Sequence, residues 1–160
     1  MNAAVLTVSD GVHAGTRADA SGDLLASLLA EAGFDVERAV VPDDADAIRQ
    51  ALVDLCRRTS CVLTTGGTGF APRDVTPEAT RATLDREAPG IAEAIRADAR
   101  SRTPHALLSR GVAGLRGSTL VVNLPGSPGG CRDGFEVLRP ALRHGLELAA
   151  GSRDSEHRQT

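Results

Sequence analysis

The sequence predicts an α/β fold: a three-layer α/β/α sandwich with a mainly parallel central sheet. Short apolar segments at residues 3–9, 34–41 and 61–65 have the composition of buried strands. Between them lie segments in which apolar residues recur with helical spacing. This β-α-β-α-β order favours parallel strands that are covered by helices on both faces.

The first two strands enclose a predicted helix. A loop over residues 10–19 follows the first strand, and Ser21-Gly22 is predicted to cap the helix. The apolar residues of this helix are Leu24, Leu25, Leu28, Leu29 and Ala32. Gly33 is expected to end it, because glycine readily takes the left-handed conformation found after helices.

A second helix is predicted to open at Pro42-Asp43-Asp44 and to lead to the third strand. Its apolar face consists of Ile48, Ala51, Leu52 and Leu55. After the third strand, Thr76 is predicted to cap a further helix, with Pro77 at its first position.

The remaining elements follow in order. Residues 91–102 are predicted to form a helix, residues 111–117 a short strand with a turn, and residues 119–124 a strand. The final helix presents Phe135, Leu138, Leu142 and Leu146 on one face. Pro140 should kink or divide this helix. We expect one domain over residues 1–150 and a polar, frayed tail over residues 151–160.

The overall composition argues against several classes of function. With a net charge of −3, the chain has no general attraction to nucleic acid or to anionic membranes. Its apolar runs are too short to span a bilayer, and Met1-Asn2-Ala3 has no basic character. We therefore expect a cytoplasmic protein with no membrane or nucleic-acid partner. Cys56, Cys61 and Cys131 have neither metal-site spacing nor an even number, which favours buried apolar roles.

The basic residues limit the chemistry further. All 18 are arginine, and the chain has no lysine, tyrosine or tryptophan. A P-loop lysine, a Schiff base and a lysyl-nucleotide intermediate are thereby excluded. Any phosphate chemistry must depend on arginine, backbone amides, hydroxyl groups or a metal ion.

A glycine-rich segment follows the third strand. Gly66, Gly67 and Gly69 allow the backbone to approach a ligand closely, so that N–H groups can point at phosphate oxygens. Such a segment can also be a simple tight turn. Asp74, a few residues later, is placed where a metal ion could bridge to bound phosphates.

Polar residues follow each of the other parallel strands. Asp10, Asp43 and Ser127 come after the first, second and last strands, and Asp74 lies in the loop after the third. Because the carboxyl ends of parallel strands meet at one edge, these residues are expected to converge there. Carboxylates beside a phosphate cradle suit Mg²⁺, which prefers hard oxygen ligands. Phosphoryl or nucleotidyl transfer is therefore the predicted reaction class.

Each carboxylate also has a purely structural interpretation. The Asp43-Asp44 pair can be a helix cap, and Asp10 can close a local turn. Arg73 and Asp74 can form a surface ion pair of little energetic weight. The functional interpretation depends on the convergence of all these residues at one edge.

Five motifs, in order over residues 3–150, resemble the molybdopterin adenylyltransferase family, which includes the bacterial MogA and MoaB proteins. They are Leu6-Thr-Val-Ser-Asp10, Val41-Pro-Asp-Asp44, Thr64-Thr-Gly-Gly-Thr-Gly69, Arg73-Asp-Val-Thr-Pro-Glu-Ala-Thr80 and Asn123-Leu-Pro-Gly-Ser-Pro128. Two shorter segments, Leu108-Ser-Arg-Gly111 and Gly114-Leu-Arg-Gly117, are also in their expected places. The chain departs from the pattern at Gly129-Gly130, which leaves only backbone amides for contacts there.

The resemblance implies a function in molybdenum cofactor biosynthesis: AMP transfer from ATP to molybdopterin, with Mg²⁺, giving adenylyl-molybdopterin and pyrophosphate. It also implies a homotrimer and a molybdenum insertase as partner. By motif, the catalytic, metal-binding carboxylates are Asp43 and Asp74. The implied nucleotide contacts are Ser9, Asp10, Gly66, Gly67, Thr68 and Gly69. The implied pterin and phosphate contacts are Thr76, Glu78, Pro125, Gly126 and Ser127.

On this basis the terminal phosphate of molybdopterin is expected to attack the α-phosphorus of ATP. That phosphate is already ionised, so no strong general base is required, and catalysis would consist of positioning and electrostatics. Two other hypotheses are a molybdopterin carrier or scaffold without turnover and a nucleotide pyrophosphatase. The carboxylates argue against the carrier, and hydrolysis of ATP without pterin would identify the pyrophosphatase.

Overall fold

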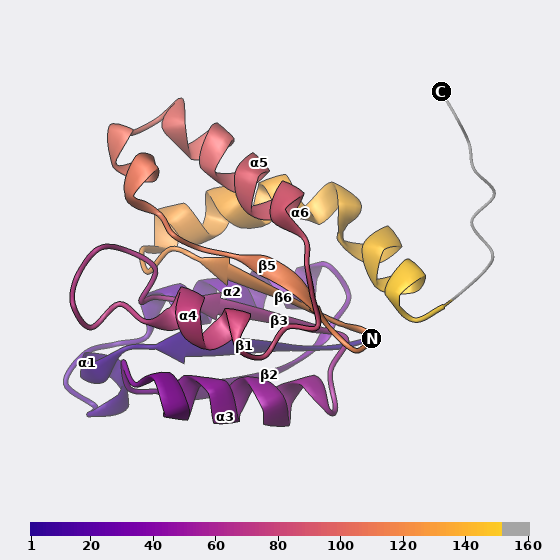
Figure 1. Cartoon of the computed structure of the whole chain (residues 1–160), viewed down its shortest axis with the longest axis horizontal. Coiled ribbons are helices and arrows are strands. Elements are labelled where there is room, and N and C mark those ends of the chain that lie inside the picture. The colour runs from indigo at the N-terminus through magenta and orange to yellow at the C-terminus, as the bar shows by residue number, and fades with distance from the viewer. Residues whose placement is uncertain (152–160) are drawn as a thin grey trace.

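The computed structural model describes residues 1–151, and most of the predicted polar tail, residues 152–160, lies outside the described residues. The middle layer is a sheet of six strands (Figure 1): β1 (Asn2–Val8), β2 (Asp35–Val41), β3 (Cys61–Thr65), β4 (Arg86–Glu87), β5 (Ala113–Arg116) and β6 (Thr119–Leu124). Their order in the sheet is β2-β1-β3-β6-β5-β4. β2, β1, β3 and β6 are parallel, whereas β5 runs antiparallel to β6 and to β4. The predicted mainly parallel α/β sheet is confirmed.

Helices cover both faces of the sheet. They are α1 (Asp10–His13), α2 (Ala20–Glu31), α3 (Ala45–Cys56), α4 (Thr76–Arg81), α5 (Pro89–Arg100), the 3₁₀ helix η1 (Pro104–Leu108) and α6 (Pro128–Ala149). α3 and α4 pack on one face of the sheet, and α2, α5 and α6 pack on the other. No helix within residues 1–151 is both long enough and apolar enough to cross a membrane.

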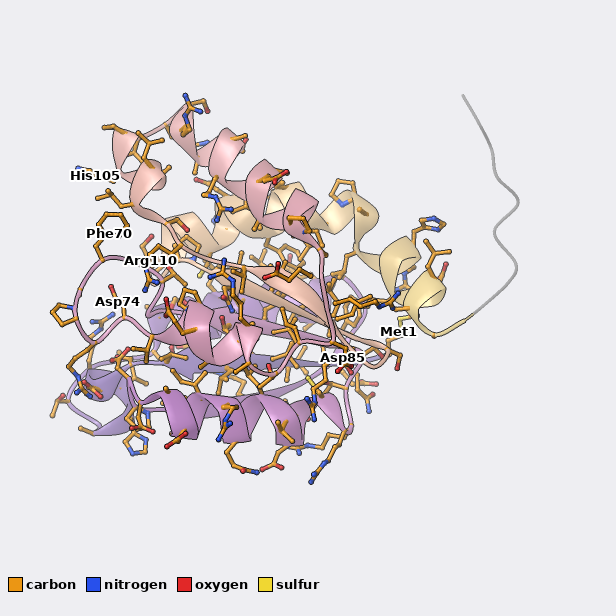
Figure 2. The ribbon with its side chains drawn as sticks, viewed as in Figure 1. Met1, Phe70, Asp74, Asp85, His105 and Arg110 are labelled. Atoms are coloured by element: carbon orange, nitrogen blue, oxygen red, sulfur yellow. The ribbon has the colours of Figure 1, made fainter. Side chains whose placement is uncertain are left out.

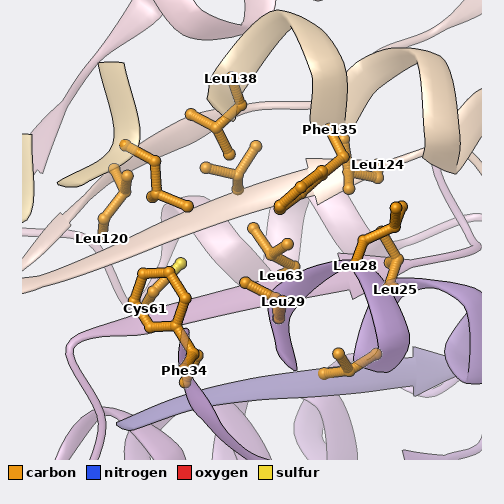
Figure 3. Packing of buried hydrophobic residues seen from close by; sticks show 14 of the residues in the cluster. Leu25, Leu28, Leu29, Phe34, Cys61, Leu63, Leu120, Leu124, Phe135 and Leu138 are labelled. Carbon is orange, nitrogen blue, oxygen red and sulfur yellow. The ribbon is translucent and has the colours of Figure 1, made fainter. Parts of the chain in front are cut away.

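The two faces of the strands bury alternate residues, as a sheet with helices on both sides requires. On β3, Leu63 faces α2 and α6, whereas Val62 faces α3. Figure 3 shows the larger cluster, in which Leu25 and Leu29 of α2 and Phe135 of α6 surround Leu63. These side chains are almost completely buried. The core thus fixes the strands, and the carboxyl ends of the four parallel strands lie at one edge of the sheet.

Several helix ends differ from the predictions. The side chain of Asp19 caps α2 by accepting a hydrogen bond from the amide of Gly22, so the predicted cap at Ser21-Gly22 is wrong. Gly33 ends the helix as predicted, with φ of 88°. Pro140 lies inside α6, which continues over 22 residues, so of the two predicted outcomes, a kink or a division, the division is wrong. Burial of Phe135 and Leu142 on either side of Pro140 holds the helix together.

Candidate active site at the carboxyl edge of the sheet

The carboxyl ends of β1, β2, β3 and β6 lie at the left in Figure 1, beside α1 and the loop before α4. From β1 the chain continues to β2 on one side, and β3 lies on the other side. Such a reversal leaves a crevice at the strand ends. A cavity of about 610 Å³ lies there, and we call it the polar cavity. It is lined by Thr7, Val8, Ser9, Val12, Arg17, Ala18, Asp19, Ala20, Ser21, Asp43, Thr65, Gly66, Gly67, Asp74, Gly126, Ser127 and Pro128.

The glycines of the polar cavity are required by space and by backbone conformation. Gly66 and Gly67 have φ of 98° and 67°, a region that favours glycine. A Cβ on Gly66 would lie 2.3 Å from the carbonyl oxygen of Val8, and one on Gly67 would lie 2.4 Å from Oγ1 of Thr76. The backbones after β1 and β3 therefore lie in close contact at Gly66, and neither glycine has space for a side chain.

Thr76 supports the loop that contains Gly66, Gly67 and Gly69, which we call the glycine loop. Its buried hydroxyl donates a hydrogen bond to the carbonyl oxygen of Gly66 (2.9 Å), and its amide donates to that of Gly67 (3.1 Å). Thr76 is the first residue of α4, and its hydroxyl makes no capping bond, so the predicted cap is wrong. Thr76 supports the loop and does not line the polar cavity.

Asp43 and Asp10 connect the ends of β2 and β1 reciprocally. The amide of Asp10 donates to Oδ2 of Asp43 (2.9 Å), and the amide of Asp43 donates to Oδ1 of Asp10 (3.0 Å). The other oxygen of Asp43, Oδ1, lies 3.3 Å from the position of a Cβ on Gly67 and so faces the glycine loop. The helix-cap interpretation is correct for the neighbouring Asp44, which accepts from the amide of Ala47.

Both carboxylate oxygens of Asp10 are used within the protein. Arg73 donates to them through Nε (2.6 Å) and Nη2 (3.0 Å). The Arg73 hydrogen bond, followed by the one from the amide of Asp43, lowers the pKa of Asp10 below its ordinary value. The suggested ion pair between Arg73 and Asp74 is wrong, because the guanidinium instead joins the loop before α4 to the end of β1. Asp10 does not line the polar cavity.

Asp74 faces the same cavity as Asp43. Its Oδ2 accepts a hydrogen bond from the amide of Ala71 (3.0 Å) and lies 2.9 Å from the position of a Cβ on Gly69. Figure 2 shows Asp74 at this edge of the molecule, with Arg110 beside it. Within residues 1–151, no cluster of three or more His, Cys, Asp or Glu side chains could hold a metal ion unaided. Any ion here would need further oxygens from water or phosphate.

A second cavity of about 460 Å³ adjoins the first, and we call it the apolar cavity. Ile95, Ala99, Ala106 and Leu108 give it apolar walls, and Ser127 lines both cavities. Its other lining residues are Thr68, Gly69, Arg96, Arg102, Thr103, His105, Ser109, Pro125, Gly129, Gly130, Asp133 and Gly134. The predicted site residues therefore divide between the two cavities, except Asp10, Thr76 and Glu78, which line neither.

Ser127 begins the longest helix at the junction of the cavities. Its hydroxyl accepts a hydrogen bond from the amide of Gly130 (3.1 Å) and so caps α6. The first turn of a helix carries partial positive charge and attracts anions. A Cβ on Gly130 would lie 2.9 Å from Ser127 Oγ and from Pro125 Cβ, so glycine here preserves the cap.

Sequence reasoning did not identify Arg17 or Asp19. Arg17 is the single basic residue among those that line the polar cavity. Asp19 lines it as well, while accepting hydrogen bonds from the amide of Gly22 and the hydroxyl of Thr7 (2.8 Å). Both lie in the segment predicted as a plain loop, which contains no motif that would distinguish them.

Comparisons with known proteins agree with this architecture. The chain is 37% identical over 153 residues to the molybdopterin adenylyltransferase of Helicobacter pylori strain J99, covering 92% of this chain and 87% of that protein. It is 43% identical over 148 residues to the molybdenum cofactor synthesis protein cinnamon of Drosophila melanogaster, covering 90% of this chain. The match spans only 25% of the cinnamon protein.

Solved structures show the same fold. The molybdopterin biosynthesis enzyme MoaB of Thermus thermophilus superimposes with a TM-score of 0.88 at 47% identity, covering 94% of this chain and 97% of that one. The molybdopterin biosynthesis Mog protein of Mycobacterium ulcerans gives a TM-score of 0.89 at 41% identity, covering 92% and 98%. The family described as "Probable molybdopterin binding domain" matches residues 4–144. The chain therefore belongs to this family of molybdenum cofactor biosynthesis proteins.

Proposed function

We propose that this protein is a molybdopterin adenylyltransferase of molybdenum cofactor biosynthesis. It transfers AMP from ATP to the terminal phosphate of molybdopterin and releases pyrophosphate. The observation that carries the proposal is the junction at Ser127 of a polar cavity and an apolar cavity. Two substrates of different polarity can meet there. The named adenylyltransferase relatives, at 37% and 39% identity, support the same reaction.

The polar cavity is assigned to the nucleotide phosphates. Backbone N–H groups of the glycine loop and the start of α6 supply hydrogen bonds without a lysine. Ser9 and Arg17 line the same cavity, and Arg17 adds the positive charge that phosphates require. Thr68 and Gly69 continue the loop into the apolar cavity.

The donor set of the polar cavity suits Mg²⁺. Asp43 and Asp74 each direct a carboxylate to it, and these residues would hold the ion together with phosphate oxygens and water. A bound Mg²⁺ would neutralise negative charge on the phosphates. Asp10 and Arg73 would act indirectly, because they hold the amide of Asp43 and the loop of Asp74.

The apolar cavity is assigned to the pterin. Its volume lies within the usual range for small-molecule sites, and Ile95, Ala99 and Leu108 offer surfaces for a flat ring. Pro125, Gly126 and Ser127 form the boundary with the polar cavity, where the terminal phosphate would lie. Thr76 and Glu78 are assigned supporting roles, since they contact the loop and Arg110.

The chemistry then depends on orientation. The protein holds the terminal phosphate of molybdopterin near Ser127 and the α-phosphate of ATP near the glycine loop. An oxygen of the pterin phosphate forms a bond to the α-phosphorus as the bond to pyrophosphate breaks. The attacking oxygen is already ionised, so no side chain must remove a proton, and preorganised amides stabilise the developing charge.

Purified protein incubated with ATP, Mg²⁺ and molybdopterin tests the proposal. Adenylyl-molybdopterin and pyrophosphate should form together, and each should depend on pterin. Asp74→Asn should reduce turnover by about a hundredfold or more, the scale for one preorganised electrostatic group, with the fold and pterin binding retained. Pterin binding without pyrophosphate release would identify a carrier, and ATP hydrolysis without pterin would identify a pyrophosphatase. Either result would overturn the proposal.

The assembly and location are also proposed from the resemblance. We infer a cytoplasmic homotrimer that passes its product to a molybdenum insertase. Sedimentation of the purified chain would test the trimer, with a monomer as the contrary result.

A further inference from the structure

Arg110 occupies the segment between η1 and β5, and its contacts converge on the loop that carries Asp74. Its Nε donates a hydrogen bond to the carbonyl oxygen of Gly69 (2.7 Å), and its Nη2 donates to that of Asp74 (2.7 Å). Its backbone amide donates to the carbonyl oxygen of Thr68 (2.9 Å). One residue thus holds both ends of the segment 68–74.

The guanidinium is itself anchored to α4. Its Nη1 pairs with the carboxylate of Glu78, which lies in the first turn of that helix. Desolvation raises the pKa of Glu78, but the hydrogen bond from Arg110, a backbone hydrogen bond and the charges of Arg110 and Arg81 together outweigh it, and the net shift is downward. The planar guanidinium can donate in several fixed directions at once, which an ammonium group cannot do.

Little else attaches the middle of this segment to the fold. Phe70 is 67% exposed, so it contributes little apolar burial. The hydrogen bonds between Ala71 and Asp74 are internal to the loop, and Thr76 holds only Gly66 and Gly67. Arg73 attaches its side chain to Asp10 through two exposed hydrogen bonds. The Arg110 contacts act on the backbone of the segment itself, at Thr68, Gly69 and Asp74.

We propose that Arg110 is a positioning residue, which holds the glycine loop and the Asp74 backbone in the geometry that receives magnesium-bound nucleotide. The identity of the ligand in this inference rests on the proposed function. The restraint of residues 68–74 by Arg110 does not depend on that function. Arg110 lines neither cavity and is assigned no contact with substrate. It acts through Gly69 and Asp74.

The test compares Arg110→Ala with Arg116→Ala. Arg116 is a matched control, because its guanidinium also donates to a backbone carbonyl, that of Thr83 (2.9 Å), and it lines neither cavity. Hydrogen exchange measures the opening of residues 68–74. In Arg110→Ala these amides should exchange about tenfold to a hundredfold faster, the scale for losing a charged hydrogen bond. Amides of β3 and β6 should exchange as in the wild type.

Ligand binding gives a second readout. The dissociation constant of the protein for ATP in the presence of Mg²⁺, measured by calorimetry, should rise at least about tenfold in Arg110→Ala. Part of the binding free energy would then be used to order the loop. Added guanidinium ion should restore part of the affinity in Arg110→Ala and none in Arg116→Ala. Arg110→Lys should fall between wild type and alanine, because lysine cannot donate to both carbonyl groups in the same way.

The outcomes separate this inference from the proposed function. Unchanged loop exchange and unchanged ATP affinity in Arg110→Ala would overturn the positioning role. Equal effects in Arg116→Ala would also overturn it, because the loss would then be a general destabilisation. If Arg110→Ala does not fold, Arg110→Lys and Glu78→Gln supply the same comparison. A wild-type protein that binds ATP but forms no adenylyl product would contradict the proposed function alone.

Discussion

At the scale of single residues, the charge balance of the polar cavity makes Arg17 significant. Asp19, Asp43 and Asp74 line the cavity with one arginine, Arg17, and Asp19 is already paired with Arg38, which is not among the lining residues. Arg17→Gln should therefore weaken ATP binding by about tenfold or more, the value of one charged hydrogen bond. Arg17→Lys should retain part of the affinity, because it keeps the charge.

Calorimetry with ATP and Mg²⁺ measures this effect. Arg49→Gln is the control, since Arg49 lies on the exposed side of α3 in a surface pair with Asp46. Equal affinities for wild type and Arg17→Gln would remove Arg17 from the nucleotide site.

The burial predicted for the cysteines is confirmed for two of the three. Cys61 and Cys131 are buried, and Cys56 is partly buried. Desolvation raises the pKa of Cys61 to about 12 and those of Cys56 and Cys131 to about 11. At pH 8 a disulfide reagent should therefore react with Cys61 and Cys131 only after the protein unfolds. Rapid labelling of two or more thiols in the native protein would contradict the buried environment.

At the scale of elements, the glycines of the loop and of the last helix should respond in opposite ways. Gly66→Ala forces a residue with a Cβ to adopt φ of 98° and brings that atom against the Val8 carbonyl. It should lower the free energy of unfolding by more than about 1 kcal/mol and weaken ATP binding. Gly145 lies inside α6, and a Cβ added there would have no heavy atom of another element within 4 Å. Gly145→Ala should raise the free energy of unfolding by about 0.5–1 kcal/mol.

Urea unfolding of the two variants checks this pair. A stable Gly66→Ala protein with normal ATP affinity would show that the left-handed conformation and close contact at Gly66 are dispensable.

The elements also show what the sequence could and could not predict. The strands at 61–65 and 119–124 have the predicted bounds, because each is a buried apolar run between clear turns. α1 was not predicted, since it is a single turn capped by Ser9 and has no buried residue. The antiparallel β4 was missed because its two residues, Arg86 and Glu87, have no strand pattern.

The candidate site also has features that the sequence could predict and features that it could not. Convergence of Asp43 and Asp74 could be predicted, because it follows from parallel strands and the position of each residue after its strand. The hydrogen-bond partners of the site residues could not be predicted. Nothing local indicates that Arg73 reaches Asp10, 63 residues away, or that Arg110 reaches Asp74. Such contacts depend on loop paths that only the folded chain defines.

At the scale of the whole molecule, two pairs of charged groups join distant segments at the carboxyl edge. Asp10 pairs with Arg73, and Glu78 pairs with Arg110. The pKa values of Asp10 and Glu78 are both lowered in the folded state, from ordinary values of 3.8 and 4.5. Folding therefore favours the ionised carboxylates, and their contribution to stability is complete above these ordinary values. It is lost as the pH falls through the lowered values, which lie below 3.8 for Asp10 and below 4.5 for Glu78.

We therefore expect the urea midpoint to decline below about pH 4 partly because Asp10 becomes protonated. In Asp10→Asn the midpoint should already be lower at pH 7, and its further decline below pH 4 should be shallower than in the wild type. Asp46→Asn removes an exposed carboxylate from α3 and controls for the change in net charge. Parallel curves for wild type and Asp10→Asn down to pH 3 would show that the link between the end of β1 and the loop before α4 does not stabilise the fold.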